Sequence, residues 1–213
     1  MPLLYDLGAG FLVRPELLGL HEGVYVPDAV RYADVCCFSG DKLLGAGQAG
    51  ILLGKREQIE KMKKNQLVRM LRVDKMTLAS LEAALRLYEE PETAMAQIPV
   101  LRMLSVSENE LKDRAQRLVS ALSAKSAFLC FEAVPCTDSP GGGALPGAEL
   151  PGWGIAVTHP ACSANRLDEA LRALPVPVIG RISKDRLLLS VRTLMPEDEA
   201  ALPGLLSHCG VSE

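Results

Sequence analysis

The sequence lacks the features that place a chain in a membrane or send it out of the cell. Its longest apolar runs, such as residues 49–53, are far shorter than the roughly 20 residues that a membrane-spanning helix needs. The first ten residues, MPLLYDLGAG, contain no basic segment followed by an apolar core, so we expect no secretory signal. These absences predict a cytoplasmic protein that makes no use of a membrane.

Motifs for metal binding and for hydrolysis are missing as well. The six cysteines form no CxxC pair, and the three histidines lack the spacing of metal ligands, so no metal site is expected. Ser39 has no histidine and aspartate partners in the order that a hydrolase triad uses. The net charge of -3 implies no general attraction to nucleic acid. We interpret the cysteines as reduced, and the adjacent Cys36 and Cys37 as buried in a strand.

What is present is an ordinary globular composition. Hydrophobic residues make up 48% of the 213 positions and charged residues 23%, which suits one large domain or two small ones. The chain enters the strand-like segment LLYDL within two residues of Met1, so we expect it to begin inside a domain. Pro91 and Pro99 bracket a linker, and this predicts one domain at residues 1–95 and a second at 96–213.

The first half has the pattern of an α/β domain. Short apolar segments with glycine-rich exits predict three strands of a mostly buried sheet. A charged helix follows, and then an amphipathic helix with Asp74 as its N-cap and an apolar face that includes Leu81, Leu85 and Tyr88. The expected elements are strands at 2–6, 35–38 and 49–53, and helices at 27–33, at 55–64 and after Asp74.

The second half predicts a small α+β domain with helices on one face of an antiparallel sheet. Ser107 and Glu110 fit a capping box that opens a helix. Lys184 and Asp185 form the tip of a predicted hairpin, and Pro203 is expected to interrupt the last helix. The expected elements are helices at 107–124, 167–174 and 196–207, and strands at 127–134, 154–158, 178–183 and 187–191, with a glycine-rich hairpin loop after residue 134.

The segment FSGDKLLGAGQAG, residues 38–50, places a single lysine among apolar and small residues. A lysine in a tight turn after a buried strand can be partly desolvated, and this favours the neutral amine, which is the nucleophilic form. A nucleophilic lysine is what a Schiff base with pyridoxal phosphate requires. The same string also fits a surface lysine at the exit of a strand, so the local pattern leaves both interpretations of Lys42 open.

Two further groups of charged residues are candidates for binding. Asp6 stands at the carboxyl end of a predicted strand, where it could face a cofactor, although an aspartate just before Gly8 also fits a simple turn. Arg69 and Arg72 lie three positions apart, so on a helix they would share a face and could clamp a phosphate-like group. A solvated charged face that pairs with acidic neighbours such as Asp74 is the alternative.

Five separated segments together resemble the bacterial selenocysteine synthases, the L-seryl-tRNA(Sec) selenium transferases. In chain order they are DLGAG, FSGDKLLGAGQAGILLG, LRVDKMTLASLEAALRLY, GGGALPGAELPGW and PVIGRISKDRLLLSVRTL. The departures are small: alanine replaces a common serine in DLGAG and GGGAL, and GAGQ replaces GGPQ. The resemblance implies an α/β chain that is the C-terminal part of a type I (aspartate-aminotransferase-like) pyridoxal-phosphate fold, with a smaller α+β C-terminal domain. The family's N-terminal part has no counterpart here, so we expect a fragment.

The resemblance also assigns roles to individual residues. Lys42 of the SGDK string matches the lysine that forms the Schiff base with pyridoxal 5'-phosphate, and Asp41 beside it matches an acidic position of the active site. Asp6 matches the partner of the cofactor's ring nitrogen, and Ser39 is assigned to cofactor binding.

The implied substrates are seryl-tRNA(Sec) and selenophosphate, and the implied product is selenocysteinyl-tRNA(Sec). Arg69 and Arg72 match arginines that bind the selenium donor. The resemblance further implies a ring-shaped homodecamer.

Two other interpretations stay open. One is a related pyridoxal-phosphate lyase of the same fold that acts on a small amino acid or amino sugar, although LVRMLRVDK and GGGALPG argue against it. The other is a folded but non-catalytic C-terminal remnant. We expect the isolated chain to bind pyridoxal phosphate weakly and to show no turnover, because the loop that holds the cofactor phosphate lies in the part of the family's fold without a counterpart here.

Overall fold

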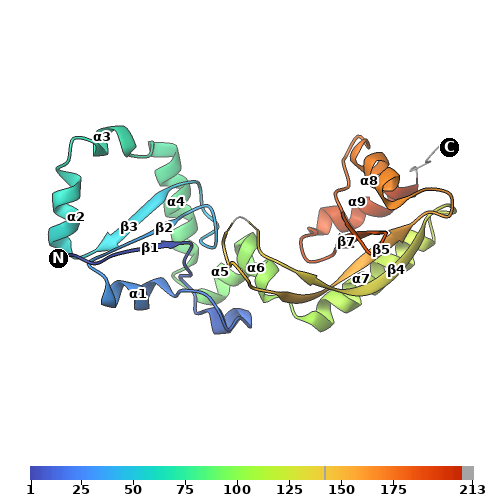
Figure 1. Cartoon of the computed structure of the whole chain (residues 1–213), viewed down its shortest axis with the longest axis horizontal. Coiled ribbons are helices and arrows are strands. Elements are labelled where there is room, and N and C mark those ends of the chain that lie inside the picture. Colours follow the sequence, from blue (N-terminus) through green and yellow to red (C-terminus); the bar gives the residue numbers. More distant parts are fainter. Residues whose placement is uncertain (142, 208–213) are drawn as a thin grey trace. The chain divides into compact units, whose positions relative to one another are not determined.

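The chain folds into two compact units in the computed structural model of Figure 1, which describes residues 1–141 and 143–207. The first unit comprises Met1–Ser105 together with Ser139–Ala148, and the second begins at Val106 and includes the chain from Glu149 onward. Each unit contains its own sheet, so the whole is a mixed α/β structure with two sheets. None of the helices in the described ranges is long and apolar enough to cross a membrane.

The first unit is built on a three-stranded sheet of β1 (Leu4–Gly8), β2 (Val35–Ser39) and β3 (Gly50–Gly54), in the order β1-β2-β3. β1 and β2 are parallel, so the chain must cross over between them, and η1 (Pro15–Leu18) and α1 (Val26–Tyr32) lie in that connection. β3 returns antiparallel to β2. The three predicted strands and the helix between them are confirmed, with their bounds shifted by one or two residues.

The prediction of a mostly buried sheet was wrong for two of the three strands. Only the central strand β2 is buried, with Cys36 and Phe38 in the core. β1 and β3 are the edges, and among the described residues neither receives full cover: Leu4 is 70% exposed and Leu52 is 52% exposed. Cys37 was also predicted to be buried but is only partly so, whereas its neighbour Cys36 is fully enclosed against α1.

Five helices follow the sheet in this unit. Asp74 caps α4 as predicted, because its Oδ1 accepts hydrogen bonds from the N–H groups of Met76 and Thr77 at 2.7 and 3.0 Å. The same cap separates α4 from the short helix before it. The helices are α2 (Arg56–Lys63), α3 (Val68–Leu71), α4 (Lys75–Leu87), α5 (Pro91–Gln97) and α6 (Pro99–Ser105).

The second unit has a four-stranded antiparallel sheet in the order β4-β5-β7-β6. One core fills the space between this sheet and its helices, and it joins Leu111, Leu122, Ile155, Leu171 and Leu206. The helices therefore cover one face of the sheet, as predicted. The elements are α7 (Glu108–Ser123), β4 (Cys130–Asp138), β5 (Leu150–Thr158), α8 (Ala164–Arg172), β6 (Arg181–Ser183), β7 (Arg186–Ser190) and α9 (Pro196–Ser207).

Most of the predictions that rest on short sequence motifs in this unit are confirmed. Ser107 caps α7 by accepting from the N–H of Glu110 at 3.3 Å, and Lys184 and Asp185 form the hairpin tip with positive φ angles of 51° and 56°. The interruption predicted at Pro203 was wrong, because α9 continues through this buried proline. A proline removes one helix hydrogen bond, and here the packing of Leu202 and Leu206 into the core holds the helix across that gap.

The two units differ from the predicted domains in two places. α5 and α6 pack against one another and α6 contacts η1, so the first unit extends to Ser105 rather than ending near residue 95. The hairpin between β4 and β5 is confirmed, but both strands are longer than predicted, and the segment Ser139–Ala148 that joins them belongs to the first unit. There Leu145 is buried close to Gly23 and Phe11.

Candidate functional site

The turn after β2 presents Lys42 on an apolar base. Gly40 N–H donates to Ala49 O at 2.8 Å, Ala46 N–H donates to Gly40 O at 2.8 Å, and Gly45 N–H donates to Lys42 O at 3.0 Å. Leu43 and Leu44 are almost fully buried, whereas Lys42 itself is half-buried. The two leucines therefore fix the backbone of the turn, and the lysine amine stays accessible at its rim.

Tyr88, the residue that follows α4, supports the turn that carries Lys42. Its hydroxyl donates to Leu44 O at 2.9 Å, and its ring packs with Leu44 and Phe38. Burial raises the pKa of the Tyr88 hydroxyl well above its ordinary value, so the group remains a donor at any physiological pH. The sequence pattern predicted Tyr88 only as part of the apolar face of a helix. It contains no local signal for the hydrogen bond that the Tyr88 hydroxyl donates.

Gly45 is a position in this turn that requires glycine. Its φ is +68°, and a Cβ there would collide with Ile98 Cγ2. We expect Gly45→Ala to destabilise the first unit by about 2–4 kcal/mol, the sum of the left-handed backbone penalty and the overpacking of Ile98. Hydrogen–deuterium exchange of peptides that cover residues 35–54 measures the loss.

Gly19 is the matched control for this prediction. Its φ is +70°, but no atom lies within 4 Å of an added Cβ, so Gly19→Ala carries the backbone penalty alone and is expected to cost about 1 kcal/mol. Equal effects of the two substitutions would show that Ile98 does not constrain the turn.

Asp6 stands on the strand next to the lysine turn. It is the register partner of Cys37 across the parallel pair β1 and β2, and its Oδ1 accepts a hydrogen bond from Gly8 N–H at 2.9 Å. That bond, the adjacent Cys37 thiol and the positive charge of Lys42 together hold the pKa of Asp6 below its ordinary value. The structure thus brings Asp6 and Lys42 into electrostatic contact at one end of the sheet. The glycine turn foreseen as the alternative for Asp6 is also present.

Ser39 and Asp41 flank the same turn. Ser39 is the last residue of β2, pairs with Gly50 of β3 and is partly buried. Asp41 is exposed and precedes Lys42 directly. Four of the six residues singled out from the sequence therefore lie on neighbouring strand ends or in the turn that follows them.

The two arginines occupy a different place. Arg69 lies in the one-turn helix α3, but Arg72 follows its last residue and has extended backbone angles, φ -63° and ψ 138°, so the prediction of a shared helix face was wrong. The reason is the Asp74 cap, which starts a new helix two residues later. Both side chains are exposed, and within the described part of the chain neither guanidinium forms an ion pair.

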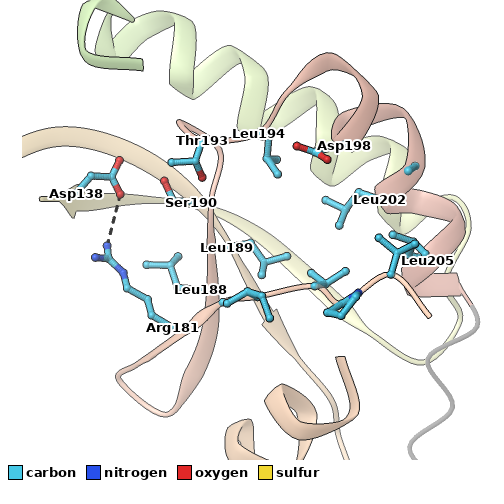
Figure 2. Close-up of a pocket in the computed structure, with 16 residues that line it drawn as sticks. Asp138, Arg181, Leu188, Leu189, Ser190, Thr193, Leu194, Asp198, Leu202 and Leu205 are labelled. Carbon is cyan, nitrogen blue, oxygen red and sulfur yellow. Dashed lines mark ion pairs between the residues drawn. The ribbon is translucent and has the colours of Figure 1, made fainter. Parts of the chain in front are cut away.

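The second unit contains an open pocket that none of the predicted residues lines. Its volume is about 430 Å³, and its walls are mainly apolar side chains of the segment before β6, of β7 and of α9. Figure 2 shows these side chains, with Asp138 and Arg181 at one edge, where the carboxylate and guanidinium are 3.9 Å apart. In the described ranges, no group of three or more histidine, cysteine or acidic side chains could hold a metal ion.

Comparison with known proteins identifies the family. The profile of the SelA family, described as L-seryl-tRNA selenium transferase, matches residues 1–195. The chain is 42% identical over 208 residues to the L-seryl-tRNA(Sec) selenium transferase of Geotalea daltonii. The aligned residues make up 97% of this chain and 45% of the relative. It is 41% identical over 199 residues to the Clostridium botulinum protein of the same name, over 93% of this chain and 43% of the relative.

A third relative, the L-seryl-tRNA(Sec) selenium transferase of Geobacter sulfurreducens, is 39% identical over 204 residues, which is 95% of this chain and 44% of the relative. The chain thus spans somewhat less than half the length of the relatives it matches. Because the family profile covers most of its residues, the chain belongs to the SelA family of L-seryl-tRNA selenium transferases.

Proposed function

We propose that this chain contributes the cofactor-anchoring lysine of an L-seryl-tRNA(Sec) selenium transferase, an enzyme that converts seryl-tRNA(Sec) to selenocysteinyl-tRNA(Sec) with selenophosphate. The observation that carries the proposal is the placement of Lys42 and Asp6. An amine in a rigid turn and a carboxylate on the neighbouring strand interact at the same end of the sheet. Relatives named for this activity match almost the whole chain.

Pyridoxal 5'-phosphate fits the donor set of this site. Lys42 offers a primary amine for covalent attachment, Asp6 offers an ionised carboxylate for the ring nitrogen, and Ser39 offers a hydroxyl at the end of β2. The proposed fold is the C-terminal part of a type I pyridoxal-phosphate enzyme. The parallel pair β1 and β2, with its crossover helix and the antiparallel β3, supports this assignment.

When bound, the cofactor supplies an electron sink for the carbanion that forms at the substrate's α carbon. Lys42 then has two tasks in sequence. Its Nζ would hold the cofactor, and the same amine, once free, would remove the α proton of the substrate as a general base. Asp6 would accept a hydrogen bond from the cofactor's ring nitrogen and so favour its protonated form, and Asp41, the chain neighbour of Lys42, would be a second acidic group of the site.

Arg69 and Arg72 are proposed to bind selenophosphate. Both guanidiniums are solvent-exposed and carry no ion pair with a described residue, so they are available to an anion. Guanidiniums bind phosphate-like groups through two parallel hydrogen bonds, which positions the donor without further chemistry from the protein. Their exposure fits a site that is completed by other parts of the enzyme or by another subunit, in keeping with the proposed homodecamer.

A chimeric enzyme tests the proposed function. This chain replaces the matching segment of the Geotalea daltonii relative, and conversion of seryl-tRNA(Sec) is followed by incorporation of radioactive selenium into tRNA. We expect conversion by the chimera and none by its Lys42→Ala form. A chimera that folds and binds the cofactor but makes no selenocysteinyl-tRNA, or one that keeps its activity without Lys42, would contradict the proposal.

A further inference from the structure

The partly buried Cys37 thiol lies against the carboxylate that the proposed function assigns to the cofactor. β1 and β2 are parallel, and their register pairs Asp6 with Cys37. Register partners on neighbouring strands direct their side chains to the same face, so the thiol and the carboxylate are adjacent. The hydrogen bond that Asp6 Oδ1 accepts from Gly8 N–H at 2.9 Å and the closeness of the thiol both lower the pKa of the Asp6 carboxylate.

We propose that Cys37 is a positioning residue for Asp6: its thiol donates to the Asp6 carboxylate and so orients it to accept the ring N–H of pyridoxal phosphate. The proposal rests on the proposed function, because it gives Asp6 the role of cofactor partner. Cys37 does not touch the reacting atoms. It acts through Asp6.

The exposure of Asp6 explains why such a donor is useful. An exposed carboxylate on an edge strand rotates freely, and each rotation would carry its oxygens away from a bound ring nitrogen. Gly8 N–H restrains one oxygen, and a second donor restrains the orientation of the group as a whole. Since each carboxylate oxygen accepts more than one hydrogen bond, a place remains for the cofactor's N–H.

The thiol is suited to remain a donor. Burial and the negative charge of Asp6 both raise the pKa of Cys37, so the proton stays on sulfur at neutral pH. The other titratable groups that act on this pair are Lys42, which faces Asp6, and Cys36, which is the chain neighbour of Cys37. Neither carries a negative charge at neutral pH, so neither displaces the thiol from the carboxylate.

The first experiment measures the thiol itself and needs no cofactor. Iodoacetamide alkylation of the 213-residue chain is followed against pH by mass spectrometry, with fragment ions that separate Cys37 from Cys36. In Asp6→Asn the loss of the carboxylate charge is expected to lower the pKa of Cys37, so alkylation near neutral pH becomes several-fold faster. Asp28→Asn is the control, because it removes an equal charge from α1, where Asp28 pairs with Arg14 and Arg31.

The second experiment measures the effect on the cofactor. Pyridoxal phosphate is titrated into the chain and into two variants, and the absorbance of the complex is recorded against pH. Cys37→Ser keeps a donor of similar size and is expected to bind within about twofold of the unaltered chain, whereas Cys37→Ala is expected to bind about five- to tenfold more weakly, in line with one lost hydrogen bond to a charged group. In the alanine variant the ring nitrogen is expected to lose its proton at a lower pH.

The two experiments separate the inference from the proposed function. An alkylation rate that is the same in Asp6→Asn and Asp28→Asn would overturn the role of Cys37, whatever the cofactor does. Equal affinity and equal pH profiles for the serine and alanine variants would overturn it as well. Failure of the unaltered chain to attach pyridoxal phosphate at Lys42, together with a faster Cys37 reaction in Asp6→Asn, would instead contradict the proposed cofactor while leaving the thiol–carboxylate pair in place.

Discussion

Replacing Lys42 with alanine is expected to abolish covalent attachment of pyridoxal phosphate to this chain. The turn that carries Lys42 is held by backbone hydrogen bonds and by two buried leucines, and none of these depends on the lysine side chain. The substitution therefore removes the amine and leaves its support in place. Incubation with pyridoxal phosphate, reduction with borohydride and peptide mass spectrometry measure the adduct directly, and we expect it on Lys42 in the unaltered chain.

Lys64→Ala is the matched control for this result. Lys64 is an exposed lysine of the same unit, at the end of α2 and away from the lysine turn. We expect low occupancy even in the unaltered chain, because residues of β1 and β3 are exposed and so leave the proposed cofactor site open to water. An adduct spread over several lysines, at a yield that Lys42→Ala does not change, would exclude Lys42 as the anchor.

Replacing Asp138 with alanine is expected to destabilise the second unit by roughly 3–5 kcal/mol, because it removes the carboxylate that pairs with a buried arginine. Arg192 is 6% exposed, its Nε donates to Asp138 Oδ2 at 2.9 Å, and its guanidinium also donates to Pro151 O at 2.6 Å. Asp138 is the last residue of β4, and Arg192 lies two residues beyond the end of β7. The pair therefore ties an edge strand to the centre of the sheet.

Glu132→Ala provides the comparison within the same sheet. Glu132 of β4 pairs with Arg186 of β7 at 2.6 Å, but the Glu132 side chain is 67% exposed and that of Arg186 is 37% exposed, so we expect a loss of about 0–1 kcal/mol. Urea unfolding is followed by the fluorescence of Trp153, the single tryptophan of the chain, which lies in β5. Should Asp138→Ala fail to fold, Asp138→Asn keeps an acceptor for Arg192 and is expected to lose less. If the free energies of unfolding lost in Asp138→Ala and Glu132→Ala differ by less than about 1 kcal/mol, the buried pair does not contribute more to stability than the pair of Glu132 and Arg186.

Signals that depend on neighbours in the sequence predicted the structure well. The caps at Asp74 and Ser107 and the hairpin tip at Lys184 each involve groups within four residues of one another, so their chemistry is visible in the sequence. Arg72 shows the limit of such reasoning. Its spacing from Arg69 fits one helix, but the Asp74 cap competes for the same segment, and the cap decides where the helix begins.

Features that depend on distant residues were not predictable from these patterns. The apolar residues of β1 and β3 predicted strands correctly, but they do not indicate which strands lie at a sheet edge. The exposure of these side chains follows from the edge position. Tyr88 read as an apolar helix residue, yet its hydroxyl supports Leu44, which is distant in the sequence. The burial of Leu145 in the first unit, and with it the place of the glycine-rich segment, has the same origin.

By itself the sequence determined the two α/β and α+β halves, most of their elements, and the family to which the chain belongs, because caps, turns and motif strings are local. Only the tertiary structure decided which of the candidate site residues lie close together. It brought Asp6 next to Cys37 and near the charge of Lys42 through the parallel register of β1 and β2, and it placed Arg72 beyond the short helix that contains Arg69. It also buried Arg192 against Asp138. The physical reason is that strand pairing and core packing bring together residues that are far apart in the chain, and no periodicity of the sequence records which strand will be the neighbour of which.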